Sequence, residues 1–360
     1  MSDAIKHECG LAFIRLRKPL SHFHAKYGTP LYGLNKLYLL MEKQHNRGQD
    51  GAGVGTIKLD PVPGLNYIDR ERSTDKQAIQ KIFAKINKGY EEAVKAEPGA
   101  ATDVELLKAR MPFLGEVLLG HLRYATFGGD NLENCHPRRR LNNWMTRNLV
   151  VAGNFNMTNV DELFQRLVGF GQYPVETSDT VTILEKIGHF LDDANEDLYR
   201  KFKKEGYTKR QSTELIAENL DIKDLLTESS EHWDGGYAIA GMFGHGDAFI
   251  LRDPNGIRPA FWYKDDEIVV AASERPVIQT TLNVLYETVH EVKPGHALIV
   301  RRNGQVEEVQ IKTPGARRSC SFERIYFSRG TDKEIYNERK ALGSAMTSNI
   351  LAEVGNDLEN

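Results

Sequence analysis

The residues that could carry chemistry begin with one cysteine at the head of an apolar run. Cys9 directly precedes residues 10–14, Gly-Leu-Ala-Phe-Ile, a pattern that predicts a buried strand. A free cysteine is usually an inert small hydrophobe, because reactivity requires a thiolate and access to it. Whether Cys9 is a nucleophile therefore depends on the residues that the fold brings beside it.

Four polar residues stand at the ends of predicted elements, where sites are commoner than in element middles. They are Arg47 after a helix, Arg123 and Asn154 at the ends of apolar strands, and Asp179 at a helix start. An arginine and an aspartate can bind the carboxylate and ammonium of an α-amino acid, and an asparagine amide can donate to an oxyanion. With a thiol, this set suffices for acyl transfer from an amino-acid side chain. Singly, each residue also fits a structural role as an ion pair, a turn residue or a helix cap, and spacing does not show that they converge.

A general base for Cys9 is the part that the sequence does not supply directly. His7 lies two residues away, which is ~6.6 Å along an extended strand and too far for a direct hydrogen bond. The α-amine of Cys9 would serve if Cys9 were the first residue, since α-amines have pKa values of ~7.7–8.0. Residues 1–8 are therefore a candidate propeptide, which this mechanism requires to be removed.

The elements that must position these residues are predicted from hydrophobic spacing and turn signals. Leu34, Leu37 and Met41 recur at helical spacing and predict a helix that ends near Gln44. Further predictions are a loop over 16–30, helices over 74–96 and 334–352, and a strand over 322–327. Between 236 and 311, apolar runs alternate with turn segments such as 253–256, which is typical of antiparallel hairpins. Antiparallel strands segregated from helices predict an α+β fold.

Composition is that of an ordinary globular chain of 360 residues with a formal net charge of −3. A small negative net charge does not favour binding to nucleic acid or to an anionic membrane, so neither is expected as a partner. The three cysteines, Cys9, Cys135 and Cys320, are far apart and have no zinc-ligand spacing. We therefore expect a reducing, cytoplasmic location and no metal. The N-terminus lacks a signal-like apolar core, and no run approaches the ~18 apolar residues of a membrane span.

Several motifs together resemble the N-terminal-nucleophile (class II) glutamine amidotransferases, and among them the amidophosphoribosyltransferase family. The matching segments are Cys9-Gly10, Gln-His-Asn-Arg-Gly-Gln-Asp at 44–50, Gly-His-Leu-Arg-Tyr-Ala-Thr at 120–126, Ala-Gly-Asn-Phe-Asn-Met-Thr-Asn at 152–159, and Thr-Ser-Asp at 177–179. Arg-Asp-Pro-Asn-Gly-Ile-Arg-Pro at 252–259 and Ser-Phe-Glu-Arg-Ile-Tyr-Phe-Ser-Arg at 321–329 favour this family over glucosamine-phosphate synthases and asparagine synthetases. The resemblance covers nearly the whole chain from Cys9 onward.

The resemblance implies a four-layer αββα N-terminal-nucleophile hydrolase fold, with two stacked, mainly antiparallel sheets and helices outside. It implies a glutaminase domain over 9–315, after the candidate propeptide, and the start of a truncated phosphoribosyltransferase domain over 316–360. Glutamine would be hydrolysed to glutamate and ammonia, and the ammonia passed to phosphoribosyl pyrophosphate (PRPP) to make 5-phosphoribosylamine in purine biosynthesis.

The resemblance also implies the roles of single residues. Cys9 is the nucleophile and its freed α-amine the base, while the Asn154 side chain and the Phe155 backbone N–H form the oxyanion hole. The glutamine-binding residues are Arg123 for the α-carboxylate, Asp179 for the α-ammonium, and in addition Arg47 and Thr126.

Three features depart from the family pattern. Eight residues precede Cys9, Phe155 stands where the family's His-Asn-Gly-Asn has glycine, and Asn46 is an extra residue inside Gln-His-Arg-Gly-Gln-Asp. A phenylalanine would be strained if this position required a positive φ. These departures leave open an alternative, a non-catalytic glutaminase-like module with a regulatory or assembly role.

The transferase half of the family's reaction is not expected in this chain. The family's PRPP signature is an apolar strand, two acids and a Gly/Thr-rich loop, whereas Asp265-Asp266 lies in a predicted hairpin turn without such a loop. No cofactor is therefore expected here, and Mg²⁺ with PRPP belongs to the missing domain. The implied partners are glutamine, the ammonia-accepting domain and further copies of the full-length chain in a homo-oligomer.

Overall fold

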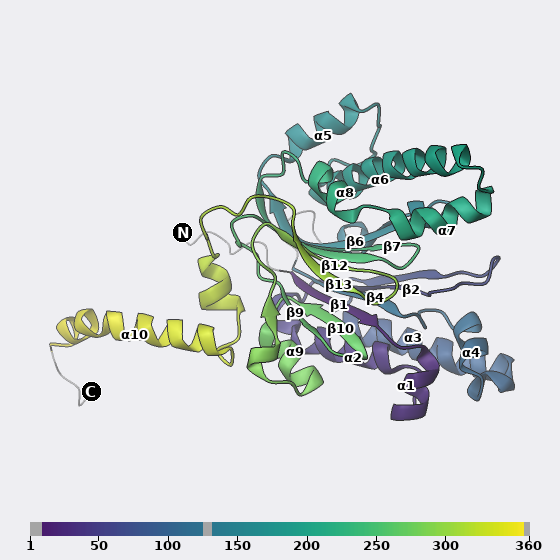
Figure 1. Ribbon diagram of the computed structural model, residues 1–360. Coiled ribbons are helices and arrows are strands. Elements are labelled where there is room, and N and C mark those ends of the chain that lie inside the picture. The colour runs from purple at the N-terminus through teal and green to yellow at the C-terminus, as the bar shows by residue number, and fades with distance from the viewer. Residues whose placement is uncertain (1–8, 125–131, 356–360) are drawn as a thin grey trace.

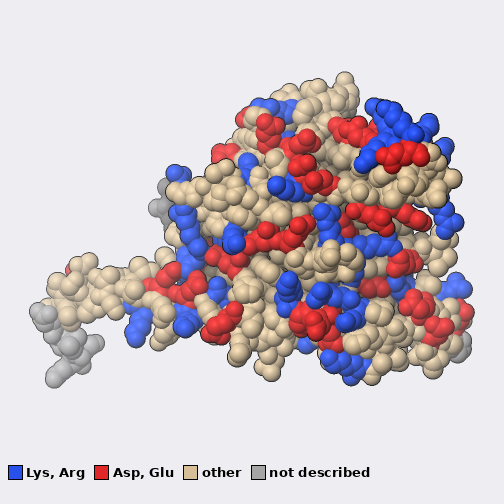
Figure 2. Space-filling model, viewed as in Figure 1, with Lys and Arg blue, Asp and Glu red and all other residues tan. Residues whose placement is uncertain are grey.

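The computed structural model describes residues 9–124 and 132–355. Two antiparallel sheets are stacked face to face, and helices cover the outer side of each (Figure 1). This arrangement is the predicted α+β fold with αββα layers. Acidic and basic side chains are interspersed on the face shown in Figure 2, in keeping with the small net charge.

The first sheet carries the strand that follows Cys9. Its described strands lie in the order β11-β9-β10-β1-β4-β2-β3. In chain order they are β1 (Gly10–Leu16), β2 (Gly51–Ile57), β3 (Ile68–Ser73), β4 (Val117–Arg123), β9 (Phe261–Lys264), β10 (Ile268–Ala272) and β11 (His290–Glu291). The central strand β1 pairs with β10 on one side and β4 on the other. Two neighbours hold the start of the chain's first strand in place.

The second sheet carries the strand that contains Asn154 and Phe155, which lie inside it and not at its end as Asn154 was expected to. Its described strands lie in the order β13-β12-β8-β7-β6-β5. They are β5 (Arg138–Arg140), β6 (Leu149–Met157), β7 (Gly235–Phe243), β8 (Ala248–Arg252), β12 (His296–Val300) and β13 (Val306–Gln310). β6 contacts β1 across the two sheets.

Helices cover both outer faces (Figure 1). Those on the first sheet are α1 (Leu20–Tyr27), α2 (Tyr32–Lys43), α3 (Ala78–Ala96), α4 (Val104–Arg110) and α9 (Arg275–Leu282). Those on the second are α5 (Val160–Gly169), α6 (Asp179–Lys204), α7 (Lys209–Asn219) and α8 (Ile222–Ser229). The short η1 (His45–Arg47) follows α2.

The apolar side chains of β1 show why the strand is buried on both faces. Leu11 and Phe13 pack between the two sheets. Ala12, Ile14 and Leu16 point to the other side, where they pack under the helices. Because side chains alternate across a strand, a continuous apolar run fits a strand covered on both faces.

Four local predictions were wrong. The expected loop over 16–30 contains α1, and the helix expected from residue 74 begins at Ala78. The expected strand over 322–327 is the short π-helical turn η6 (Glu323–Phe327). The segment 253–256 is not a hairpin turn, because β8 before it and β9 after it belong to different sheets.

The last described helix, α10 (Lys333–Glu353), extends away from the layered body (Figure 1). Ile335 is its buried residue. Tyr336, Leu342, Met346 and Ile350 are about half exposed. This helix therefore adds little to the two-sheet core.

Candidate active site

The chain just after Cys9 is fixed by a buried glutamine. The Gln44 side-chain amide donates to the carbonyl oxygens of Leu11 (3.1 Å) and Leu40 (3.2 Å), and its oxygen accepts from the Ser273 backbone N–H (3.1 Å). The Ser273 hydroxyl accepts from the Leu11 N–H at 3.0 Å. Cys9 itself is partly exposed. Cys9 thus precedes a backbone that is held by Gln44 and Ser273, the residues that follow α2 and β10.

Arg47 lies fully buried beside Cys9. Its Nε donates to the Cys9 carbonyl oxygen at 3.2 Å. Its Nη2 forms an ion pair with Glu323, and its Nη1 lies 3.6 Å from Glu274 Oε1. A buried guanidinium requires such counter-charges, because an unpaired charge is costly away from water. The pKa of Glu274 is raised overall, because the effect of burial outweighs the opposing effect of the nearby Arg47 charge.

Asn154 meets the same carboxylate from the second sheet. Its Nδ2 donates to Glu323 Oε1 at 3.4 Å, so one oxygen of Glu323 is shared by Asn154 and Arg47. The structure therefore brings together Cys9, Arg47 and Asn154, as predicted residues of one site. Sequence reasoning used 321–329 as a family motif and did not single out Glu323. The only sequence feature that could have pointed to Glu323 is its position as a single acidic residue within the aromatic segment 322–327.

Phe155 fits its position without backbone strain. It lies within β6, and its φ is not positive. Its ring stacks on His136, with the ring centres 5.3 Å apart and an interplanar angle of 24°. The departure from glycine is therefore accommodated by extended backbone and by packing.

Two buried histidines bond to β6, and one of them, His136, connects it to the start of α6; sequence reasoning missed both. His136 Nδ1 accepts from the Gly153 N–H (3.3 Å), so its Nε2 carries the proton and donates to Thr180 Oγ1 (2.9 Å). The Thr180 hydroxyl then donates to Asp179 Oδ1 at 3.3 Å. His121 Nε2 donates to the Gly153 carbonyl at 3.1 Å. Burial lowers the pKa of His121 to about 3 and the pKa of His136 well below its usual value.

Asp179 is the first residue of α6, after the cap residue Ser178. Its Oδ1 also accepts from the Thr180 backbone N–H at 2.7 Å. Burial raises the pKa of the Asp179 carboxyl. The partial positive charge of the helix N-terminus favours the ionised form at this place.

Arg123 is the last residue of β4, the strand that pairs with β1 next to Cys9. Gly10 pairs with Leu122, so Cys9 and Arg123 are the next residues along the two paired strands. The Arg123 carbonyl accepts from the Asp50 N–H at 3.0 Å. A Cβ on Gly48 would lie 2.6 Å from the Leu122 carbonyl carbon, so only glycine lets this loop pack here. The loop with Arg47 is thereby pressed against the end of β4.

Some predictions fall outside the described residues. These are Thr126 and the candidate propeptide 1–8. Within 9–124 and 132–355, no three His, Cys, Asp or Glu side chains are grouped as metal ligands. In the same residues, no helix combines the length and apolar character needed to cross a membrane.

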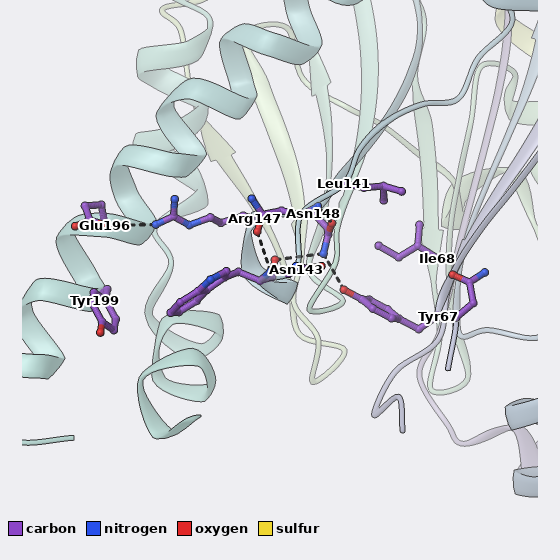
Figure 3. A pocket seen from close by; sticks show the side chains of 11 residues that line it. Tyr67, Ile68, Leu141, Asn143, Arg147, Asn148, Glu196 and Tyr199 are labelled. Atoms are coloured by element: carbon purple, nitrogen blue, oxygen red, sulfur yellow. Dashed lines mark hydrogen bonds and ion pairs between the residues drawn. The ribbon is translucent and has the colours of Figure 1, made fainter. Parts of the chain in front are cut away.

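A separate hollow lies between the β2–β3 hairpin and α6, with a volume of about 820 Å³ (Figure 3). Two pairs of its polar side chains bond to each other. Asn148 Nδ2 donates to the Tyr67 hydroxyl at 2.8 Å, and Arg147 pairs with Glu196 at 3.3 Å. None of the predicted site residues lines it. The contacts among Cys9, Arg47, Asn154 and Glu323 lie elsewhere.

Comparisons with known proteins bear on the family and the fold of this chain. Residues 112–319 match the family described as glutamine amidotransferases class-II. Amidophosphoribosyltransferase of Bacillus subtilis is 29% identical over 331 residues, which cover 89% of this chain and 54% of that protein. The Archaeoglobus fulgidus amidophosphoribosyltransferase is 26% identical over 318 residues, covering 86% and 54%. The chain thus spans about half the length of the curated relatives that it matches.

Solved structures support the fold. The B. subtilis glutamine PRPP amidotransferase, solved with ADP and GMP, superposes with a TM-score of 0.56 at 23% identity, covering 89% of this chain and 53% of that one. A structure described as the allosteric regulatory enzyme of purine biosynthesis gives a TM-score of 0.58 at 24% identity, with the same coverage. Because the family match extends over more than half of the chain, this protein belongs to the class-II glutamine amidotransferases.

Proposed function

We propose that this chain hydrolyses glutamine to glutamate and ammonia through a thioester on Cys9. We further propose that it is the ammonia-supplying half of an amidophosphoribosyltransferase, which makes 5-phosphoribosylamine from PRPP in purine biosynthesis. The observation that carries the proposal is the contact of Arg47 with the Cys9 carbonyl, together with the Glu323 carboxylate that Arg47 shares with Asn154. The similarity to amidophosphoribosyltransferases supports the choice of pathway.

The proposed chemistry starts at the Cys9 thiol. The free α-amine of Cys9 takes the thiol proton, and the thiolate attacks the side-chain amide carbon of glutamine. The Asn154 amide and the Phe155 N–H stabilise the resulting oxyanion. The intermediate collapses as the amine returns its proton to the leaving nitrogen, which departs as ammonia. Water then hydrolyses the thioester to release glutamate.

In this proposal, glutamine is bound through its α-carboxylate and α-ammonium groups. Arg123 binds the α-carboxylate, Asp179 binds the α-ammonium, and Thr126 adds a further contact. The contact of Arg47 with the Cys9 carbonyl supports a role beside the nucleophile. Because its guanidinium already pairs with Glu323 and Glu274, the proposed contribution of Arg47 to glutamine binding is electrostatic.

The proposed division of the chain is a propeptide over 1–8, a glutaminase domain over 9–315, and the beginning of a phosphoribosyltransferase domain over 316–360. The exposed apolar side chains of α10 support the last boundary, because such residues usually pack against further structure. The acceptor of ammonia, Mg²⁺ with PRPP, and homo-oligomerisation belong to the full-length enzyme in this proposal.

The test compares three chains in an assay of glutamate and ammonia release. One begins at Cys9, one begins at Met1 without processing, and one begins at residue 9 with Cys9→Ser. The proposal expects release from the first chain alone, because only it has both the thiol and the free amine. Equal release from the unprocessed chain would contradict the role of the α-amine. No release from any chain would favour the non-catalytic module.

A further inference from the structure

Residues 321–329, here called the clasp, lie on the loop that carries Asn46 and Arg47. Asn46 Nδ2 donates to the Phe327 carbonyl at 2.9 Å, and its Oδ1 accepts from Arg329 Nη2 at 3.1 Å. Asn46 Nδ2 also lies 3.2 Å from Glu274 Oε1. The extra residue of the 44–50 motif thus uses both ends of its amide to hold the clasp. These contacts join segments about 280 positions apart.

Glu323 is the clasp residue that reaches the nucleophile's surroundings. It is 3% exposed and lies in the π-helical turn η6. Turns of this type are often found at functional sites. One of its oxygens accepts from both Arg47 and Asn154, and Arg47 in turn holds the Cys9 carbonyl. A single carboxylate therefore contacts two residues of the proposed site.

We propose that Glu323 is a positioning residue for glutamine hydrolysis, and that Asn46 latches it in place. This inference rests on the proposed function. A primary amide has two N–H donors, so donation to Glu323 does not exhaust Asn154 and fixes the direction of its second N–H. The same carboxylate orients the Arg47 fork. Glu323 acts through these two residues and does not touch glutamine.

Loss of the Glu323 charge should misplace a donor to the oxyanion. Misplacement of a catalytic group by 1 Å can cost about 100-fold in rate. The α-carboxylate and α-ammonium of glutamine are bound elsewhere in this account, so the loss belongs in kcat. Glu323→Gln is nearly isosteric, and Arg47 keeps Glu274 as a counter-charge.

The test measures kcat and KM for glutamine in chains that begin at Cys9. We expect Glu323→Gln to lower kcat about 10- to 100-fold with KM within about twofold, and Glu323→Asp to recover part of the loss. Asn46→Ala should lower kcat about 3- to 10-fold, because Glu323 stays but its segment loosens. The control is Glu338→Gln, which removes an exposed acid that pairs with Arg324 of the clasp and should leave both constants unchanged.

Equal kcat values for Glu323→Gln and Glu338→Gln would overturn the inference, as would a change confined to KM. If circular dichroism shows that Glu323→Gln does not fold, the Asn46→Ala variant serves as the test. A kcat of Asn46→Ala equal to that of the parent chain would then overturn both the latch and the positioning role. A glutamine-mimicking diazoketone separates this failure from failure of the proposed function. A parent chain that is neither active nor alkylated at Cys9 contradicts both proposals, whereas an active parent with an equally active Glu323→Gln contradicts only this one.

Discussion

At the scale of single residues, the site contains a buried arginine, two carboxylates that pair with it, and the Asn154 amide that bonds to one of them. Arg47 is fully buried between Glu323 and Glu274, and Asn154 donates to the acid that Arg47 binds. Buried pairs of this kind add little net stability, but breaking one leaves an uncompensated charge. The arrangement is better explained by orientation of the groups beside Cys9 than by stabilisation of the fold.

The first prediction concerns the oxyanion. Asn154→Ala should lower kcat for glutamine about 100- to 1000-fold with little change in KM, because the lost donor acts only on developing charge. Steady-state kinetics of a chain beginning at Cys9 measures this effect. A loss confined to KM would instead mean that Asn154 binds ground-state glutamine.

The second prediction concerns substrate binding. Asp179→Asn keeps the oxygen that accepts from the Thr180 N–H but removes the negative charge. Hydrogen bonds to charged groups contribute about 1.5–3 kcal/mol, so KM for glutamine should rise about 10- to 100-fold. Asp161→Asn, a change on the exposed start of α5, is the control. An unchanged KM would remove Asp179 from the ammonium site.

The sequence identified candidate residues by type and by their place at element ends, as with Cys9 and Arg47. It did not identify His121, His136 or Glu323, because their importance depends on contacts between distant segments. Glu323 meets Asn154 across 169 positions. No local pattern encodes such a pairing. The roles of the site residues remain predictions.

At the scale of elements, β6 is the strand that links the site to the rest of the second sheet. Its Gly153 bonds to His136 through its N–H and to His121 through its carbonyl. Both imidazoles are buried and hold a single tautomer through these bonds. Protonating either one would place an extra charge between the sheets.

The third prediction follows from the lowered pKa values of these two histidines. The unfolded chain binds protons on histidine below about pH 6.5, while His121 stays neutral down to a pKa of about 3. The stability contributed by these neutral histidines is therefore fully present well above pH 6.5 and falls as the pH drops below it, approaching about 1.4 kcal/mol per pH unit for each histidine.

Urea unfolding between about pH 7 and pH 5 measures this slope. His136→Gln retains an acceptor and a donor but cannot titrate. The dependence of the unfolding free energy on pH should therefore lose the contribution of one histidine. An identical slope in the parent chain and the variant would contradict the assignment of His136.

The elements were predicted best where hydrophobic spacing decides the structure. α2 and β4 follow from their apolar repeats. α1 was missed because Pro19 and Gly28, read as loop signals, instead cap a short helix whose Phe23 is buried. The turn η6 was mistaken for a strand because an aromatic segment suits either structure until its contacts are known.

At the scale of the whole molecule, stacking of the two sheets is what assembles the site. Cys9 stands at the head of β1 in the first sheet and Asn154 lies on β6 in the second. The clasp and α10 follow after both sheets are complete. The layered fold could be anticipated from the family resemblance, whereas the docking of the clasp could not.

The fourth prediction concerns the formation of phosphoribosylamine, which the proposed division into domains assigns to another part of the enzyme. Asp265 lies in the tight turn between β9 and β10, where its carboxylate accepts from the Glu267 and Ile268 N–H groups. A second pair, Asp192-Asp193, lies inside α6. Neither pair follows a strand into a phosphate-binding loop. Given ammonia and PRPP, the 360-residue chain should form no phosphoribosylamine, and product in that assay would refute the proposed division into domains.

The most direct test of a nucleophilic Cys9 is the site of covalent modification by a glutamine-mimicking diazoketone. The chain beginning at Cys9 is treated with the reagent, and its intact mass and peptide map are measured. We expect one adduct on Cys9, protected by glutamine, and much slower labelling when residues 1–8 remain attached. Adducts on Cys135 or Cys320 instead of Cys9, or no adduct on a folded chain, would contradict a nucleophilic role for Cys9.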